Sequence, residues 1–222
     1  MGIDWVRYEE SISKTVDDFL ESPYSYYSEN DLHCQLYLNM CNLGLNQKCL
    51  VNTPLGLASS TILHKEYPTK GRYKRNNNGP SAKIETGSRG HFDLSLWDPE
   101  HSAKRLISSP GGIGEQRTIG AVELSLNEHH ERFKWHALWD HMKLSDPANE
   151  IEKGVILFFV RDYPYESTGF PRDGFIKTLS ENFKDKDGVS LIYVERYKEE
   201  KIVHLLTKGS FPKLSNRYSI EF

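Results

Sequence analysis

This chain has no long apolar stretch, no cysteine framework and no bulk excess of positive charge. Its 222 residues contain no run of about 18 apolar residues, so we expect no transmembrane helix and no membrane contact. The first residues lack the charged-then-apolar pattern of a signal peptide. Three cysteines without paired spacing argue against a disulfide framework and favour a reducing, cytoplasmic location.

The formal net charge is −3, so a nucleic-acid partner would need basic residues concentrated in one place. One such concentration lies between residues 65 and 89, interleaved with Tyr67 and Tyr73. The candidate nucleic-acid-binding residues in this segment are Lys70, Arg72, Lys74, Arg75 and Arg89. Two interpretations stay open: a solvated hairpin arm, or a clamp on the phosphate backbone of a nucleic acid.

The length fits one domain over 1–222, and hydrophobic periodicity predicts alternating helices and strands. Helices are expected over 6–21, from an N-cap at Ser28 with Asp31 three residues on, over about 128–144 and near 172–184. Strands are expected near 60–67, around Asp93 and Glu123, and at 154–160, 190–194 and 203–206. This order predicts an α/β fold with a mixed central sheet flanked by helices.

Two acidic residues each stand inside a short apolar run. Asp93 lies in Gly-His-Phe-Asp-Leu-Ser-Leu-Trp, and Glu123 lies in Ile-Gly-Ala-Val-Glu-Leu-Ser-Leu. Period-two alternation places Asp93 and Ser95 on one face of the first strand, and Glu123 and Ser125 on one face of the second. If the strands pair, the two carboxylates converge on one face and repel unless a cation such as Mg²⁺ or Mn²⁺ lies between them.

With these residues in this order, the chain resembles the PD-(D/E)XK nuclease superfamily, which has a restriction-endonuclease-like α-β-β-β-α-β core. The resemblance covers about 28–160, matching Asp93, Glu123 and the helix acid Glu29. Residues 161–222 would be a C-terminal elaboration or the completion of the sheet. The family's lysine position holds Ser125. Three accounts stay open: Ser125 is tolerated, a lysine such as Lys134 replaces it, or the site is inactive.

The resemblance implies a metal-dependent phosphodiester hydrolase, an endonuclease of restriction, repair or defence type acting on DNA, with a homodimer as a possible assembly. Asp93, Glu123 and the backbone carbonyl of Leu124 would hold Mg²⁺ (or Mn²⁺), and Glu29 would complete the ligand set. The alternative is a catalytically silent nucleic-acid-binding or assembly module on the same fold. A third reading is an interaction protein whose acids face solvent.

Overall fold

The computed structural model describes residues 2–76, 79–83, 88–102, 116–126, 130–161, 176–177, 181, 188–205, 211 and 214, with the backbone alone at 74–76, 79–83 and 130–135. The helices are α1 (Trp5–Glu21), α2 (Glu29–Asn42), α3 (Pro99–Ser102) and α4 (His130–Ser145), with short 3-10 turns at Pro23–Ser25 (η1) and Pro147–Asn149 (η2). The strands are β1 (Lys48–Thr53), β2 (Gly56–Thr61), β3 (Leu63–Asn76), β4 (Gly79–Lys83), β5 (Ser88–Trp97), β6 (Thr118–Leu126), β7 (Lys153–Arg161), β8 (Val189–Tyr197) and β9 (Glu200–Leu205).

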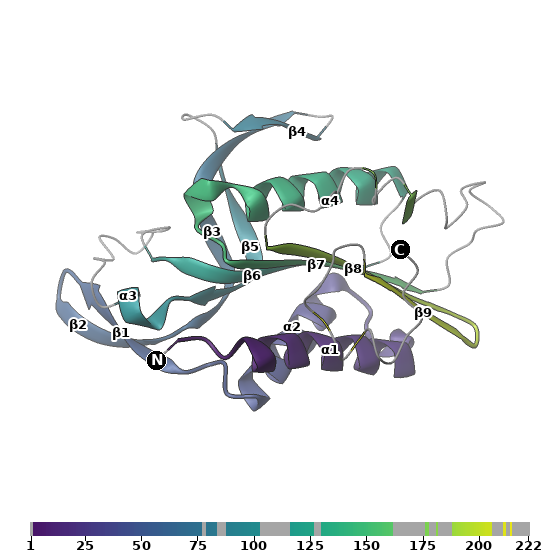
Figure 1. Cartoon of the computed structure of the whole chain (residues 1–222), viewed down its shortest axis with the longest axis horizontal. Helices are drawn as coiled ribbons and strands as arrows, with labels where there is room; N and C mark the ends of the chain where they lie inside the picture. The colour runs from purple at the N-terminus through teal and green to yellow at the C-terminus, as the bar shows by residue number, and fades with distance from the viewer. Residues whose placement is uncertain are drawn as a thin grey trace.

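The strands form a central mixed sheet and a small separate ribbon. The central order is β4-β3-β5-β6-β7-β8-β9, and β1 pairs with β2 alone. Strands β6, β7 and β8 run parallel, whereas β3, β5 and β6 pair antiparallel. Helices α1 and α2 cover one face and α4 covers the other (Figure 1). The expected mixed sheet flanked by helices is therefore confirmed.

Each face of the sheet has its own apolar core. The larger core joins α1 and α2 to the sheet through residues such as Ile12, Leu36 and Leu157. The smaller core lies between α4 and the other face, with Ala137, Leu144 and Ile156 among its members. Residues of β7 alternate between the two cores, so both of its faces are covered, as its continuous apolar run predicts.

The β3–β5 pair is distorted on the β3 side, opposite Asp93. The β3 residue at this point, Glu66, has a left-handed φ of 54°, a conformation that costs free energy for a residue with a side chain. On either side of this point, Phe92 packs in the α4-side core while Leu94 packs in the α1–α2 core. The expectation that Phe92, Leu94 and Leu96 share one face is therefore wrong at Phe92, because the distortion interrupts the alternation.

Buried polar contacts fix the carboxyl end of α4 against β3. The Asn149 side chain donates to the backbone carbonyl of Lys143 at 2.7 Å and accepts from Gly71 N at 2.8 Å. Asn149 also donates to the Tyr73 hydroxyl, which in turn donates to Asp146. Since these groups are buried and mutually satisfied, they hold the last turn of α4 in one position over the sheet.

The remaining predicted strands and helices can be compared with the structure one by one. The strand near 203–206 is present as β9. The strand expected near 60–67 instead begins at Leu63 and runs on to Asn76 as β3, while residues 60–61 end β2. Most of the helix expected near 172–184 lies outside the described residues. Among the helices that are described, we find none with the length and apolar character needed to cross a bilayer.

Candidate metal centre

Helix α2 presents an acid and a histidine to the sheet, one turn apart. The Asp31 carboxylate accepts a hydrogen bond from Ser28 N at 2.8 Å, so the predicted capping box starts the helix at Glu29. Residues four positions apart lie on the same helix face, which places His33 beside Glu29. The His33 Nε2 atom lies 3.8 Å from Glu29 Oε1. His33 is 2% exposed, so its ring points inward.

Asp93 lies where β5 separates from β6. The antiparallel pairing runs through Leu94↔Val122, and the next opposing pair in that register would be Asp93 and Glu123. Instead of a ladder bond, the Asp93 carboxylate accepts the backbone N–H of Leu124 at 2.7 Å. This bond fixes one oxygen of Asp93, and the same oxygen lies 3.4 Å from His33 Nε2. The β5–β6 pairing therefore ends beside a carboxylate that faces α2.

Glu29, His33 and Asp93 together form a cluster with metal-ligand spacing. Each offers one ligand atom, and these atoms all lie within 4.8 Å of one another. Neither ring nitrogen of His33 has a hydrogen-bond partner within the described part of the chain, although the ring is buried. A buried imidazole without a hydrogen bond is costly. A metal ion bound by His33 and the two carboxylates would give one of these nitrogens a partner, so the residues fit a metal ion.

The second acid, Glu123, faces α4. Its Oε1 atom lies 2.7 Å from Lys143 Nζ, which also lies 3.0 Å from Asp140 Oδ1. All three residues are buried, with exposures of 2%, 5% and 7% for Glu123, Lys143 and Asp140. Lys143 Nζ also donates to the carbonyl of His91 on β5 at 3.0 Å. The stem of Lys143 passes so close to Gly90 that a Cβ there would lie 3.0 Å from it.

The charge of Asp93 affects the pKa values of Glu123, Asp140 and Lys143. Burial raises the pKa of Glu123 well above its usual value, and Asp140 and Asp93 add to this effect while Lys143 opposes it. Burial acts to lower the pKa of Lys143, but Asp140 and Glu123 outweigh it and raise the pKa above its usual value. Lys143 therefore stays protonated near neutral pH. This buried cation lies beside the carboxylates of Glu123 and Asp140, and the charge of Asp93 also contributes to its raised pKa.

The structure separates the predicted acids into two connected groups. Asp93 and Glu29 contact His33 of α2, whereas Glu123 contacts Lys143 of α4. Asp93 and Glu123 thus contact different helices, although the charge of Asp93 still raises the pKa of Glu123 across the β5–β6 junction. Leu124 contributes its N–H to Asp93. Ser125 is buried on β6, and Lys134 lies on α4 with its side chain outside the described part.

The basic residues lie on β3 and β5. Lys70 forms an ion pair with Glu150, and Arg72 stands directly opposite Arg89 across the β3–β5 pair. Lys74 and Arg75 also belong to β3, but their side chains lie outside the described part. Arg72 is exposed, and Arg89 is partly exposed four residues before Asp93.

Sequence reasoning missed His33 and did not choose Lys143. The signal for His33 was its spacing of four residues from Glu29, which places both on one face of a predicted helix. Lys143 is nine residues from Lys134, which is about two and a half helical turns. The described geometry therefore assigns the contact with Glu123 to a lysine in the last turn of the helix.

A divalent cation is expected to raise the melting temperature of this chain. Saturating Mn²⁺ should stabilise the folded state by about 3 kcal/mol when it is present at a hundredfold excess over its Kd. Because imidazole nitrogen is a better ligand for Mn²⁺ than for Mg²⁺, Mn²⁺ should act at lower concentration. Thermal denaturation with increasing metal measures both effects.

His33→Ala should lose the preference for Mn²⁺ and most of the shift in melting temperature. The matched control is His101→Ala, which removes a partly exposed histidine of α3 paired with Asp98. An unchanged metal response in His33→Ala would show that the histidine is not a ligand.

We compared the chain with protein-family models, curated proteins and solved structures, and none of the three comparisons found a match. The geometry of the Glu29–His33–Asp93 cluster and its neighbours is therefore what points to a function.

Proposed function

We propose that this chain is a metal-dependent phosphodiester hydrolase, an endonuclease that acts on DNA. The observation that carries the proposal is the Glu29–His33–Asp93 cluster, in which a buried histidine without a hydrogen bond lies between two carboxylates. The surplus of carboxylates over nearby cations makes the site electrostatically suited to a divalent cation. Mg²⁺ and Mn²⁺ are the ions that such carboxylate sites prefer.

The order of elements supports a restriction-endonuclease-like core. Helix α2 is followed by β3, β5, β6, α4 and β7, with the β4 hairpin strand inserted between β3 and β5. The acids occupy the first helix and the second and third strands of that series, as the resemblance to PD-(D/E)XK nucleases implies. The basic residues Arg72 and Arg89 lie on the two strands that lead to Asp93, where they would contact the phosphate backbone.

Within this proposal, Glu29, His33 and Asp93 would hold the metal ion. When bound, the ion would polarise a phosphoryl oxygen and lower the pKa of a bound water molecule. The hydrogen bond from Leu124 N orients the Asp93 carboxylate, whose bonded oxygen also faces His33 Nε2. Glu123 lies behind this group, and its negative charge is balanced by Lys143.

Lys143 would take the role that the resemblance gives to the position of Ser125. The ammonium group is fixed by Glu123, Asp140 and the carbonyl of His91, so it cannot rotate away from the acids. Its pKa is raised above the usual value, although burial acts against this, so the positive charge persists over the range in which a nuclease works. A fixed positive charge at this place favours the extra negative charge that develops on phosphate during hydrolysis.

One observation favours the second candidate, a silent binding module. Glu123 is 2% exposed and ion-paired with Lys143, so it is engaged inside the protein rather than presented to a ligand. In that case the metal cluster and the basic strands would bind nucleic acid without cutting it. This candidate differs from the first only in the hydrolytic step.

Incubation with supercoiled plasmid and with labelled single-stranded DNA separates the two candidates. With Mg²⁺ or Mn²⁺ the nuclease proposal predicts nicked, linear or shortened products, and with EDTA it predicts none, because the ion would polarise the phosphate and activate the attacking water. DNA binding without any cutting, measured in the same preparations by mobility shift, would establish the silent module instead.

A further inference from the structure

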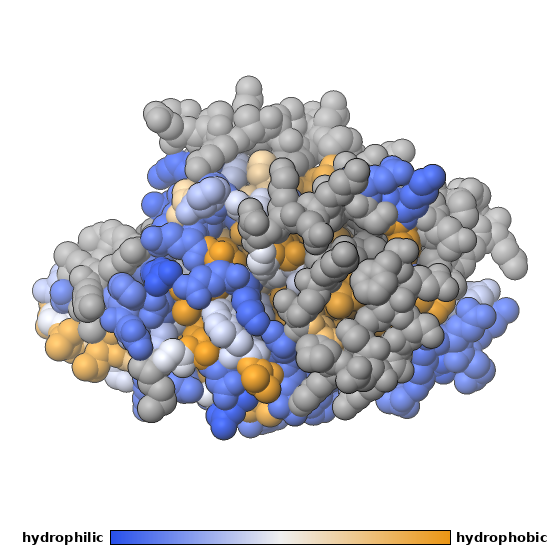
Figure 2. Space-filling model, in the orientation of Figure 1, coloured by the Kyte–Doolittle hydropathy of each residue, from blue (hydrophilic) through white to orange (hydrophobic). Residues whose placement is uncertain are grey.

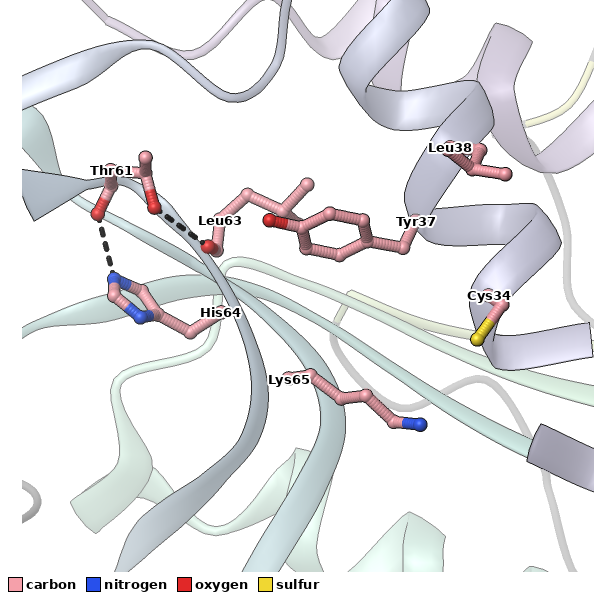
Figure 3. Close-up of a pocket in the computed structure, with 7 residues that line it drawn as sticks. All are labelled: Cys34, Tyr37, Leu38, Thr61, Leu63, His64 and Lys65. Atoms are coloured by element: carbon pink, nitrogen blue, oxygen red, sulfur yellow. Dashed lines mark hydrogen bonds between the residues drawn. The ribbon is translucent and has the colours of Figure 1, made fainter. Parts of the chain in front are cut away.

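A cavity of about 580 Å³ lies between α2 and β3, next to the candidate metal centre. It is lined by Cys34, Tyr37, Leu38, Thr61, Leu63, His64 and Lys65. Its volume is in the range of small-ligand pockets. Figure 3 shows the Tyr37 ring and the Lys65 side chain reaching into this space from α2 and from β3, respectively.

The walls of the cavity are suited to a flat apolar ring. Tyr37 packs against the α1–α2 core but is only partly buried, and Leu38 is 54% exposed, so both retain accessible apolar surface. On the β3 side, His64 stacks on Trp97 with ring centroids 3.6 Å apart, and its Nε2 donates a hydrogen bond to Thr61 O at 2.7 Å. Burial lowers the pKa of His64, so its ring is neutral near physiological pH.

Lys65 lines the cavity and also contacts the start of α2, where Glu29 lies. Lys65 Nζ donates to Asn30 Oδ1 at 3.0 Å, and Asn30 is the chain neighbour of Glu29. Lys65 also pairs across the sheet with Leu94, the chain neighbour of Asp93. An ammonium group has three donors, so Lys65 retains capacity for an anion. A ligand with a flat ring and an adjacent phosphate matches this combination.

We propose that the cavity is a subsite for an unpaired nucleobase, so that the chain binds single-stranded nucleic acid in preference to a duplex. The base would lie against the Tyr37 ring, and Lys65 would contact the phosphate next to the one at the metal cluster. A base in a duplex is paired and stacked, and it could enter only at the cost of leaving the helix. The proposal rests on the proposed function for the identity of the substrate, since it names the form of nucleic acid that this site takes.

The test measures binding rather than cutting. The whole chain is mixed with labelled oligothymidylate, oligouridylate or a duplex of the same length, with Ca²⁺ in place of Mg²⁺, and fluorescence anisotropy gives the affinities. We expect one of the single strands to bind about tenfold more tightly than the duplex, in keeping with the strength of base–aromatic stacking. Tyr37→Ala and Lys65→Ala should each remove most of that preference.

Two further variants control for folding and for charge. Tyr37→Phe keeps the ring and should bind as the wild type does, and Lys48→Ala removes an exposed lysine of β1 outside the cavity. Alkylation provides an independent readout, because Cys34 is exposed in the cavity wall while burial raises the pKa of the thiols of Cys41 and Cys49. Bound single strand should protect Cys34 from iodoacetamide.

Equal affinity for duplex and single strand, with unprotected Cys34, would overturn the subsite. This result is distinguishable from failure of the nuclease proposal. Preferential binding without cutting keeps the subsite and removes the hydrolase, whereas metal-dependent cutting without strand preference keeps the hydrolase and removes the subsite.

Discussion

Asp93→Asn should abolish metal-dependent cleavage while leaving the protein folded. The amide oxygen of asparagine can still accept the hydrogen bond from Leu124 N, so the junction between β5 and β6 keeps its bond. What is lost is the negative charge that would bind the cation beside His33 and Glu29. A bound metal supplies several kcal/mol of charge stabilisation, and about 4 kcal/mol corresponds to a thousandfold in rate. Initial rates of plasmid nicking measure the loss.

The control for this variant is Glu199→Gln, which removes a fully exposed carboxylate in the turn between β8 and β9. Its rate should stay within about twofold of the wild type, since exposed ion pairs contribute little. Asp93→Ala should also destabilise the fold, because it leaves the Leu124 amide without its acceptor. If Asp93→Asn cut DNA at the wild-type rate, Asp93 would have no part in hydrolysis.

Lys143→Met should be the most destabilising single substitution in the candidate site. Removing one partner of a buried ion pair leaves the other charges uncompensated and costs about 3–5 kcal/mol. Here Glu123 and Asp140 both lose their shared cation, and the carbonyl of His91 loses a donor. Urea denaturation measures the free energy of unfolding. Cleavage should fall in the same variant if Lys143 takes the role of the motif lysine, whose position holds Ser125.

The cost of Lys143→Met should depend on pH. Burial already raises the pKa of Glu123 and Asp140 in the folded protein, and loss of Lys143 raises them further. Acids whose pKa is higher in the folded state bind more protons there than in the unfolded state, so stability falls as pH increases through that range. The variant should therefore be destabilised less at about pH 5 than at about pH 8.

Lys14→Met serves as the matched control, because Lys14 makes an exposed i,i+4 ion pair with Asp18 at 2.9 Å. It should cost about 0.5 kcal/mol and show little dependence on pH. Adding Glu123→Gln to Lys143→Met should recover part of the lost stability, since a neutral amide no longer needs the cation. An additive double variant would show that the two residues do not interact, against the structure.

Much of the fold could be predicted from local signals. The capping box at Ser28 and Asp31 starts α2 where expected, and the continuous apolar run at 154–160 identifies a strand covered on both faces. These features depend on neighbouring residues alone, so the sequence carries them directly. The distortion at Glu66 could not be predicted, because a positive φ at a glutamate is imposed by tertiary packing rather than by its own preference.

In the candidate site too, local signals identify some residues, whereas others depend on tertiary packing. Asp93 and Glu123 were found because each interrupts an apolar strand, and Glu29 because a helix begins there. The partners of these acids depend on which helix packs on which face. His33 and Lys143 come from opposite sides of the sheet, and the period-two pattern of the strands contains no information about either helix. The Lys134 hypothesis chose a position in the first half of α4, whereas the observed contact is made from its last turn.

The contacts between β6 and the last turn of α4 have a consequence for how the chain matures during synthesis. The carboxylates of Glu29, Asp93 and Glu123 leave the ribosome before Lys143, the buried cation that the structure places beside Glu123. Until α4 docks, like charges oppose closure of β5 onto β6, and these contacts join residues far apart in the chain, which slows folding. A nascent chain that ends before residue 143 would therefore lack a compensated charge cluster. The candidate site reaches this arrangement only when α4 is in place.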